Sequence, residues 1–224
     1  MKFQFIPLVK ICCIQNVEEA WLAIQHGASA LGLVSEMPSG PGVISEQAIV
    51  EIAASVPPGI ATFLLTCKQD SEEIIEQQRR CRVNTLQLVD ELKNGTHADL
   101  RKALPGIGIV QVIHVTGDES VSEASTAAQH VDAILLDSGD PNLQVKELGG
   151  TGRTHNWQLS KLIREAVSVP VFLAGGLNPN NVGDAIREVG PFGIDVCSGV
   201  RTDGQLDSAK LTAFMAQIRS AATT

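Results

Sequence analysis

The chain has 224 residues, of which 44% are hydrophobic and 19% are charged, and its formal net charge is −8 at pH 7. This composition supports one large folded core and argues against disorder. The negative charge disfavours nucleic acid and anionic membranes as partners, and no segment approaches the ~18 apolar residues of a membrane span. Five irregularly spaced cysteines are typical of free thiols in a reducing compartment, so we expect a cytoplasmic protein.

Short apolar segments alternate with longer amphipathic segments along the whole chain. The apolar segments are rich in Val, Ile and Leu, a pattern typical of strands buried on both faces of a parallel sheet. The predicted strands are Leu8–Cys12, Ala30–Val34, Ile60–Leu65, Thr85–Leu88, Ile109–Val115, Ala133–Asp137, Val171–Ala174 and Gly193–Cys197. The predicted helices that follow them are Val17–His26, Ser45–Ser55, Ser71–Arg80, Thr96–Leu104, Ser120–Gln129, Trp157–Ala166, Pro179–Glu188 and Ser208–Ser220.

Strand–helix units in series, without a break in composition, predict a single (β/α)8 TIM barrel, with residues 1–224 as one domain. The alternative is an open, doubly wound sheet, which usually has a glycine-rich phosphate loop near its N-terminus. Here Cys13-Ile14-Gln15 follows the first strand, and the glycine-rich turns come late in the chain. Because the late loops of a barrel commonly hold phosphate, the barrel is favoured.

Active-site residues of such a barrel lie at the C-terminal ends of the strands. Cys12, His114 and Asp137 lie at the ends of the first, fifth and sixth predicted strands, and a cysteine facing an aspartate can serve as base and acid. The later turns contain glycines whose backbone N–H groups can approach an anion: Gly149, Gly150 and Gly152 with Thr151, then Gly175 and Gly176, then Gly199 with Ser198. We therefore expect a small phosphorylated ligand. Adjacent cysteines without a His/Cys cluster predict no metal site.

The same residues resemble the phosphoribosylanthranilate isomerase family, in the same order along almost the whole chain. The motifs are Lys10-Ile11-Cys12, Leu135-Leu136-Asp137, Gly149-Gly150-Thr151-Gly152, Leu173-Ala174-Gly175-Gly176-Leu177-Asn178-Pro179 and Ser198-Gly199-Val200. The resemblance implies an Amadori rearrangement in tryptophan biosynthesis, in which an aminoaldose phosphate becomes an aminoketose phosphate through an enolamine, without metal or cofactor. It also implies site roles. Cys12 matches the general base that removes the proton from carbon two, and Asp137 matches the general acid that protonates the ring oxygen. The late glycines and Ser198 match the phosphate-binding backbone.

The chain departs from the family pattern mainly at the far end of the substrate. Gly40-Pro41-Gly42 stands where the family has Ser-Pro-Arg, whose arginine helps to hold the aromatic carboxylate or the sugar. Other departures are Val89-Asp90 for His-Gly, His155-Asn156 for Phe-Asp, Arg201 for Glu, and Cys13 for Gly. We expect Arg153, Arg201 or His114 to supply the missing positive charge. We expect Cys13 to point to the opposite face of the first strand and to serve in packing.

Three functions remain open from the sequence: phosphoribosylanthranilate isomerase itself, a divergent isomerase or lyase of another phosphorylated sugar, and a non-catalytic protein that binds a phosphorylated ligand. Cys12 and Asp137 argue against the third, because mere binding requires neither. Gly42, Val89 and Asp90 keep the second open. The sequence leaves open whether the protein is a monomer or a homodimer.

Overall fold

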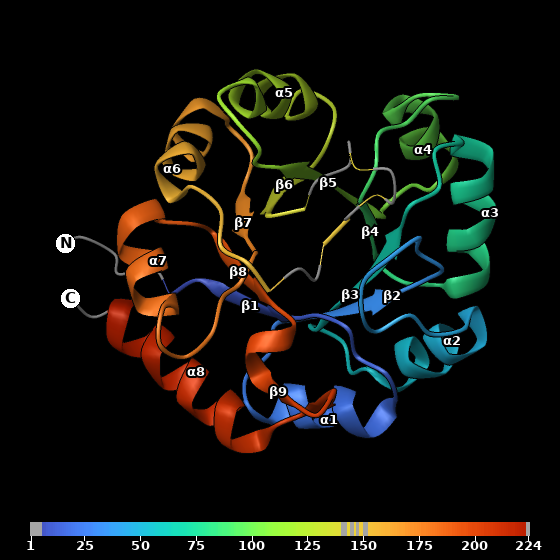
Figure 1. Ribbon diagram of the computed structural model, residues 1–224. Helices are drawn as coiled ribbons and strands as arrows, with labels where there is room; N and C mark the ends of the chain where they lie inside the picture. The colour runs from blue at the N-terminus through green and yellow to red at the C-terminus, as the bar shows by residue number, and fades with distance from the viewer. Residues whose placement is uncertain (1–5, 140–142, 144–145, 147, 150–151, 223–224) are drawn as a thin grey trace.

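Parallel strands close into a barrel in the computed structural model, which describes residues 6–139, 143, 146, 148–149 and 152–222 (Figure 1). The barrel strands, each neighbouring the next, are β1 (Leu8–Ile11), β2 (Ala30–Val34), β3 (Ala61–Thr66), β4 (Thr85–Leu88), β5 (Gly108–His114), β6 (Ala133–Asp137), β7 (Val171–Leu173) and β8 (Gly193–Val196). β8 pairs with β1 from Leu8↔Gly193 to Ile11↔Val196, and this pairing closes the barrel. The predicted (β/α)8 fold is confirmed.

A ring of helices surrounds the strands (Figure 1). They are α1 (Val17–Gln25), α2 (Glu46–Ser55), α3 (Ser71–Cys81), α4 (His97–Ala103), α5 (Glu119–Ala127), α6 (Trp157–Ala166), α7 (Val182–Val189) and α8 (Ser208–Ala222). Several begin where a polar side chain accepts a hydrogen bond from the first turn, as Asn16, Ser45 and Asp70 do. These caps fix where each loop ends at the mouth of the barrel. No helix that the structure describes is long and apolar enough to cross a membrane.

The core has two layers, because the strands are buried on both sides. Outward-facing strand residues such as Ile11 pack against the helices, while Phe63, Val112 and Phe172 belong to a second cluster inside the barrel. The Phe63 and Phe172 rings meet edge to face with centroids 6.0 Å apart. Lys10 is also fully buried, with its Nζ 5.4 Å from the centroid of Phe63. A charged group inside this apolar interior requires a specific partner.

The turn before α7 differs from the prediction. The expected helix start at Pro179 is wrong, because α7 begins at Val182. The Asn178 side chain accepts a hydrogen bond from the Asn180 N–H group at 2.9 Å, so it closes a turn before the helix and does not cap the helix itself. This turn lies next to the glycines that follow β7.

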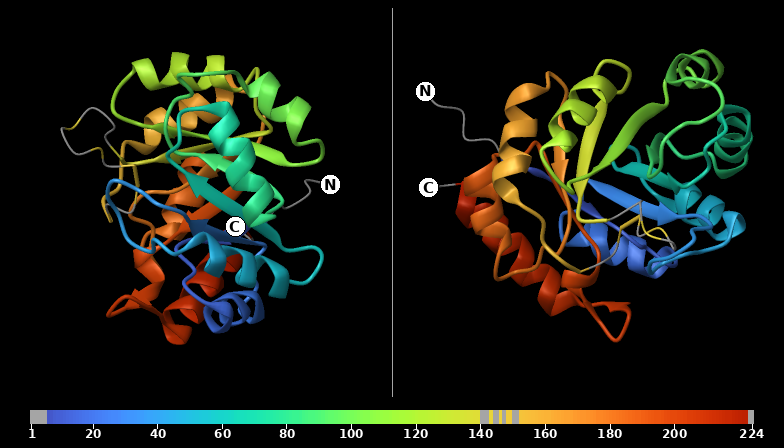
Figure 2. Two further views of the ribbon diagram at one scale, coloured as in Figure 1. Left: turned by 90° about the vertical axis from the view of Figure 1, so that its right-hand side faces the viewer. Right: turned by 45° about the horizontal axis from the view of Figure 1, so that its top comes forward.

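A hairpin after β8 was not predicted. A short 3-10 helix, Ser198–Val200, leads into β9 (Arg201–Thr202) and β10 (Gln205–Leu206). Asp203 and Gly204 connect these strands with φ of 49° and 80°, as an Asp-Gly hairpin turn requires. Figure 2 shows the hairpin projecting from the barrel at the start of α8, at the same end of the barrel as the loop after β2.

Candidate active site

A cavity opens at the C-terminal ends of the strands, where the loops after β1, β2, β6, β7 and β8 meet. Predicted site residues that line it are Cys12, Asp137, Gly152, Gly175, Gly176 and Ser198. His114, Arg153 and Gly199 are described by the structure but are not among its lining residues, and Gly150 and Thr151 lie outside the described residues. We call this space the principal cavity. It brings the predicted thiol and carboxyl group together.

Cys12 follows the last residue of β1, and its thiol shares the inner side of the barrel with the Lys10 side chain. Gly32 on β2 leaves room for both groups. A Cβ at Gly32 would lie 2.7 Å from the Cys12 Sγ and 2.9 Å from the Lys10 Nζ. The sulfur and the ammonium group are therefore neighbours. Lys10 Nζ also donates a hydrogen bond to Asp195 Oδ1 at 2.9 Å, and Asp195 reaches the lining of the cavity.

These neighbours shift the thiol toward its ionised form. Burial would lower the pKa of the Lys10 ammonium group, but Asp195 and then the Cys12 sulfur raise it, so Lys10 keeps its charge. The pKa of the Cys12 thiol is lowered, because its interaction with the neighbouring Cys13 thiol and the charge of Lys10 together outweigh burial. A thiolate is the form of cysteine that can take up a proton. The sequence prediction had assigned no role to Lys10.

Cys13 lines the same cavity as Cys12, so the prediction that it points to the opposite face is wrong. That prediction assumed a regular strand, but β1 ends at Ile11 and Cys13 has a φ of 63°, in the left-handed region. The turn directs the side chain into the cavity wall. The available signal was a cysteine at a position where the resembled family has glycine, the residue that adopts positive φ without strain.

Arg201 fastens this turn through its backbone. Its Nη2 donates to the carbonyl oxygens of Cys13 and Cys12 at 2.5 and 3.4 Å. The guanidinium group also binds the Glu19 carboxylate, with Nη1–Oε1 and Nη2–Oε2 distances of 2.8 and 2.9 Å. Arg201 is buried, and it is not among the residues that line the principal cavity. The charge of Arg201 is therefore paired with Glu19. The expectation that Arg201 supplies a positive charge to the substrate is not supported by this position.

Asp137 ends β6 and is buried in the wall of the cavity. The described residues that line the cavity include no cation that could face its carboxyl group. Its Oδ1 accepts a hydrogen bond from the Ser138 N–H group at 2.8 Å, and a Cβ at Gly149 would lie 2.7 Å from its Oδ2. His155 is another residue to which the sequence assigned no role, and it interacts electrostatically with the Asp137 carboxylate. Burial lowers the pKa of the His155 imidazole, and Asp137 only partly opposes this effect. The imidazole is thus biased to its neutral form, and its Nε2 lies 2.7 Å from the Ser160 Oγ.

The turn after β7 is held in a conformation suited to glycine. Gly175 and Gly176 have φ of 81° and 61°. The Gly176 carbonyl oxygen accepts hydrogen bonds from the side-chain amides of Asn178 and Asn181 at 3.2 and 3.0 Å. These bonds fix the turn, and a residue with a Cβ would adopt it only with strain.

Backbone segments of three loops touch one another through these glycines. A Cβ at Gly176 would lie 2.5 Å from the backbone carbon of Arg153, and a Cβ at Gly199 would lie 1.9 Å from the Leu177 carbonyl oxygen. Among the described residues, the N–H groups of Gly176, Ser198 and Gly199 have no acceptor. Such N–H groups on a glycine-rich turn are suitable donors for a phosphate. We call this region the glycine rim: Gly152, Gly175, Gly176, Ser198 and Gly199.

His114 and Arg153 occupy different settings. His114 ends β5 and is buried, and its Nε2 lies 3.1 Å from the Val89 carbonyl oxygen. His114 therefore holds the backbone segment that follows β4. Arg153 is exposed, and its backbone packs against Gly176 at the glycine rim. Within the described residues, no group of three or more His, Cys, Asp or Glu side chains could hold a metal ion.

The wall opposite the glycine rim is apolar. It consists of Val34, Met37, Pro41, Leu65, Val89 and Leu148. A second cavity lies beside this wall, and the two cavities share Met37 and Leu148 in their linings. No described Lys, Arg or His side chain lines the principal cavity, whereas the second cavity is rich in charged groups.

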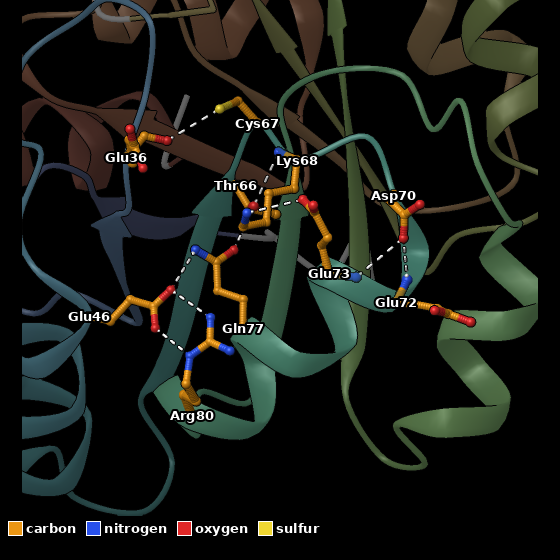
Figure 3. Close-up of polar contacts among 10 residues, drawn as sticks. All are labelled: Glu36, Glu46, Thr66, Cys67, Lys68, Asp70, Glu72, Glu73, Gln77 and Arg80. Atoms are coloured by element: carbon orange, nitrogen blue, oxygen red, sulfur yellow. Dashed lines mark hydrogen bonds and ion pairs between the residues drawn. The ribbon is translucent and has the colours of Figure 1, made fainter.

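The Lys68 and Arg80 side chains of the second cavity are paired with acidic side chains (Figure 3). Arg80 Nε and Nη2 lie 2.7 and 3.0 Å from the Glu46 carboxylate oxygens, which joins α3 to α2. Lys68 Nζ donates to Glu73 Oε2 at 3.1 Å. We call the region the charged rim: Glu46, Lys68, Glu73, Arg80, and the ion-paired Asp90 and Lys146. Because each cation there already has an acidic partner, none is poised for an anionic ligand.

Comparisons with known proteins agree with this geometry. Residues 9–217 match the sequence profile of a family described as N-(5'phosphoribosyl)anthranilate (PRA) isomerase. The N-(5'-phosphoribosyl)anthranilate isomerase 2 of Methanosarcina mazei is 36% identical over 209 residues, which cover 92% of each chain. The crystal structure of phosphoribosyl anthranilate isomerase from Thermotoga maritima is similar with a TM-score of 0.80 and 29% identity, covering 96% of this chain and 99% of that one. A further crystal structure, with a TM-score of 0.77, 27% identity and the same coverage, is of a phosphoribosyl anthranilate isomerase in complex with reduced 1-(o-carboxyphenylamino)-1-deoxyribulose 5-phosphate.

Proposed function

The chain belongs to the N-(5'-phosphoribosyl)anthranilate isomerase family, and from this premise we propose that Cys12 and Asp137 are its base and acid and that the glycine rim holds the substrate phosphate. The predicted family and the predicted enzyme class, an isomerase, are confirmed, and the predicted activity in tryptophan biosynthesis is that of this family. One observation carries the proposal. The thiol and the carboxyl group line one cavity, and four residues of the glycine rim, Gly152, Gly175, Gly176 and Ser198, line it as well.

The proposed reaction is the Amadori rearrangement of N-(5'-phosphoribosyl)anthranilate. Asp137 gives a proton to the ring oxygen of the ribose, and the ring opens to an iminium ion. The Cys12 thiolate then removes the proton from carbon two, which leaves an enolamine. The enolamine becomes the aminoketose by tautomerisation, so no bond to the enzyme forms and no electron acceptor is required. Asp137 can act as an acid only while its carboxyl group is protonated.

The surroundings of Cys12 support its role as the base. Its pKa is lowered by the neighbouring Cys13 thiol and by Lys10, and the room that Gly32 leaves keeps the sulfur next to the ammonium group. The glycine rim supports the phosphate site, because the N–H groups of Gly176, Ser198 and Gly199 have no acceptor among the described residues and its backbone allows a close approach. The five free thiols of the chain support a reducing location, and we propose that the enzyme acts in the cytoplasm.

The apolar wall is the place that we propose for the anthranilate ring. Met37, Leu65 and Leu148 offer the flat apolar contact that an aromatic ring requires. The carboxylate of that ring has no described cation in the lining of the cavity, because Gly42 replaces the arginine of the resembled family and Arg201 is bound to Glu19. This observation favours a second candidate function, in which the substrate is a related phosphorylated aminosugar without the carboxylate.

A fluorescence assay tests the first function. We expect the wild type to consume phosphoribosylanthranilate, and we expect Cys12→Ser and Asp137→Asn each to lower kcat by ~100-fold or more, the usual contribution of a general base or acid. Cys67→Ser and Asp184→Asn are matched controls, since Cys67 and Asp184 lie outside the principal cavity. A wild type that leaves phosphoribosylanthranilate unchanged but isomerises the corresponding aniline compound would support the second function.

A further inference from the structure

One buried side-chain amide in the wall of the principal cavity takes no part in the steps assigned to Cys12 and Asp137. Gln87, on β4, is 3% exposed and lines the cavity. Its Oε1 is buried and has no hydrogen-bond partner among the described residues. A buried carbonyl group without a donor reduces the stability of a fold, so its presence in a cavity wall indicates that a ligand supplies the donor.

Two other buried glutamines show what the Gln87 amide lacks. Gln77 Oε1 accepts a hydrogen bond from Thr66 Oγ1 at 2.7 Å, and Gln78 Nε2 donates one to the Val83 carbonyl oxygen at 2.8 Å. Both glutamines lie on α3, outside the lining of the principal cavity. Their amides are held by the fold. Within the described part of the chain no hydrogen bond fixes the Gln87 amide, so it can turn about its last side-chain bond without losing one.

Gln87 lies within the apolar wall of the cavity. In the barrel register it pairs with Leu65 of β3 and Val110 of β5, which both belong to the interior cluster. Val89, two residues later, points to the same side and also lines the cavity. Gln87 is thus a polar group among the apolar side chains that we propose for the aromatic ring.

The proposed binding mode brings the nitrogen of the substrate to this amide. In that mode the phosphate lies at the glycine rim, and carbons one and two lie between Cys12 and Asp137. The aromatic ring lies on the apolar wall. The nitrogen joins carbon one to the ring, so it lies where the sugar ends and the apolar wall begins. Gln87 belongs to this side of the cavity.

The nitrogen carries a hydrogen atom throughout the proposed reaction. It is a neutral amine in the substrate, carries positive charge in the iminium ion that forms when the ring opens, and is neutral again in the enolamine. A hydrogen bond from this N–H group to an amide oxygen is therefore strongest at the iminium ion, because a charged donor forms the stronger bond. An interaction that strengthens toward the transition state raises kcat.

An amide suits this position better than a carboxylate. The Gln87 amide accepts a hydrogen bond without a net charge. A carboxylate there would disfavour the Cys12 thiolate and would compete with Asp137 for its proton. Asp195 also lines the cavity, but its carboxylate is bound to Lys10 at 2.9 Å.

We propose that Gln87 is a catalytic residue whose side-chain carbonyl group accepts a hydrogen bond from the N–H group of the substrate and stabilises the iminium ion. This inference deepens the proposed function, and it rests on that function for the roles of Cys12 and Asp137. No bond to Gln87 forms, and no proton passes to or from it. The ligand class is an N-aryl aminosugar phosphate with a free N–H group, which both candidate functions share.

Turnover by a Gln87→Met variant tests the catalytic role. Methionine has a similar length, and its thioether is only a weak acceptor. We expect kcat for phosphoribosylanthranilate to fall by about 10- to 100-fold, while KM changes by less than about threefold, because the bond is strongest after the ring has opened. An unchanged kcat would overturn the proposal, as would a loss confined to KM.

Thermal unfolding separates this role from support of the fold. Gln87→Met removes an unpaired buried amide, so its Tm should equal or exceed that of the wild type. Gln78→Met is the matched control, because it removes the bond to Val83 outside both cavities. It should lower Tm and leave kcat unchanged. An equal loss of Tm in the two variants would show that the Gln87 amide holds the fold, and the proposal would be wrong.

A pair of inhibitors tests the assigned atom without turnover. The probes are 1-anilino-1-deoxyribitol 5-phosphate, which has the N–H group, and 1-phenoxy-1-deoxyribitol 5-phosphate, which has an ether oxygen in its place. Neither carries a carboxylate on the ring. By titration calorimetry we expect the wild type to bind the anilino compound about tenfold more tightly, and Gln87→Met to bind both equally. Equal affinities in the wild type would overturn the proposal.

The proposed function and the role of Gln87 fail by different results. A wild type that consumes no phosphoribosylanthranilate would contradict the first candidate function. A preference for the anilino compound that Gln87→Met abolishes would still support the hydrogen bond from the substrate nitrogen to Gln87.

Discussion

The glycine rim and the charged rim lie on either side of the same barrel mouth and use opposite chemistry. The charged rim has lysine and arginine side chains, yet each of them described by the structure is bound to an acidic partner. The glycine rim has backbone N–H groups without acceptors among the described residues. A search for basic side chains would therefore select the side opposite to the one that we propose for phosphate. In an acidic protein, free backbone donors identify an anion site better than formal charge does.

A single methyl group at the glycine rim should have the largest effect on binding. Gly176→Ala would place a Cβ 2.5 Å from the Arg153 backbone at a φ of 61°. The turn must then shift, so we expect KM for phosphoribosylanthranilate and Ki for inorganic phosphate to rise by about tenfold or more, as charged hydrogen bonds are lost.

Gly190→Ala is the control for backbone strain alone. Gly190 has a φ of 64°, and a Cβ there would meet nothing within 4 Å. This variant should unfold at a lower temperature with an unchanged KM. If Gly176→Ala and Gly190→Ala changed KM equally, backbone strain alone would explain both changes. The glycine rim would then have no special role in anion binding.

The buried Glu19–Arg201 pair should have an intermediate effect, on stability first. Its two side chains are 11% and 6% exposed, and Glu19→Gln leaves the arginine without its charged partner. We expect a loss of about 2 kcal/mol in the free energy of unfolding at neutral pH. Burial alone would raise the pKa of Glu19, but hydrogen bonding by Arg201 lowers it below that of the unfolded chain. The pair therefore stabilises above the unfolded pKa, and this benefit disappears as pH falls through the folded pKa. Urea unfolding of the wild type and Glu19→Gln should thus converge in acid; a constant difference at all pH values would contradict this account.

The exposed Arg80–Glu46 pair should have the smallest effect. Arg80 is 53% exposed, so water and salt screen its charge. In Arg80→Gln we expect a Tm close to that of the wild type and an unchanged KM, measured in the same fluorescence assay. A large rise in KM would mean that the charged rim takes part in binding, and the two rims would then not differ in function.

The alternation of apolar and amphipathic segments was sufficient to predict the barrel, because strands buried on both faces and their helices leave long periodic signals. Cys12 and Asp137 could be placed at the mouth because the fold puts strand ends there. Cys13 could not be placed correctly. A periodic pattern assumes regular backbone, and a non-glycine residue with positive φ breaks that assumption.

Contacts between residues that are distant in the chain also could not be predicted from the sequence. Lys10 and Asp195 are 185 positions apart, and neither position by itself indicates a buried ion pair. Asp203-Gly204 is different, because this dipeptide is a strong local signal for a hairpin and was overlooked. Local turns are thus recoverable from the chain, whereas partners across the barrel require its closed geometry.

The contact between Arg201 and the Cys13 carbonyl oxygen spans 188 positions and joins the last strand unit to the first. During synthesis, the turn at Cys13 lacks its contact with Arg201 until the hairpin after β8 has left the ribosome. Catalytic competence should therefore be the last property that a nascent chain acquires, after most of its secondary structure has formed. For the same reason, we expect proteolytic cleavage within that hairpin to abolish catalytic activity while most of the barrel stays folded.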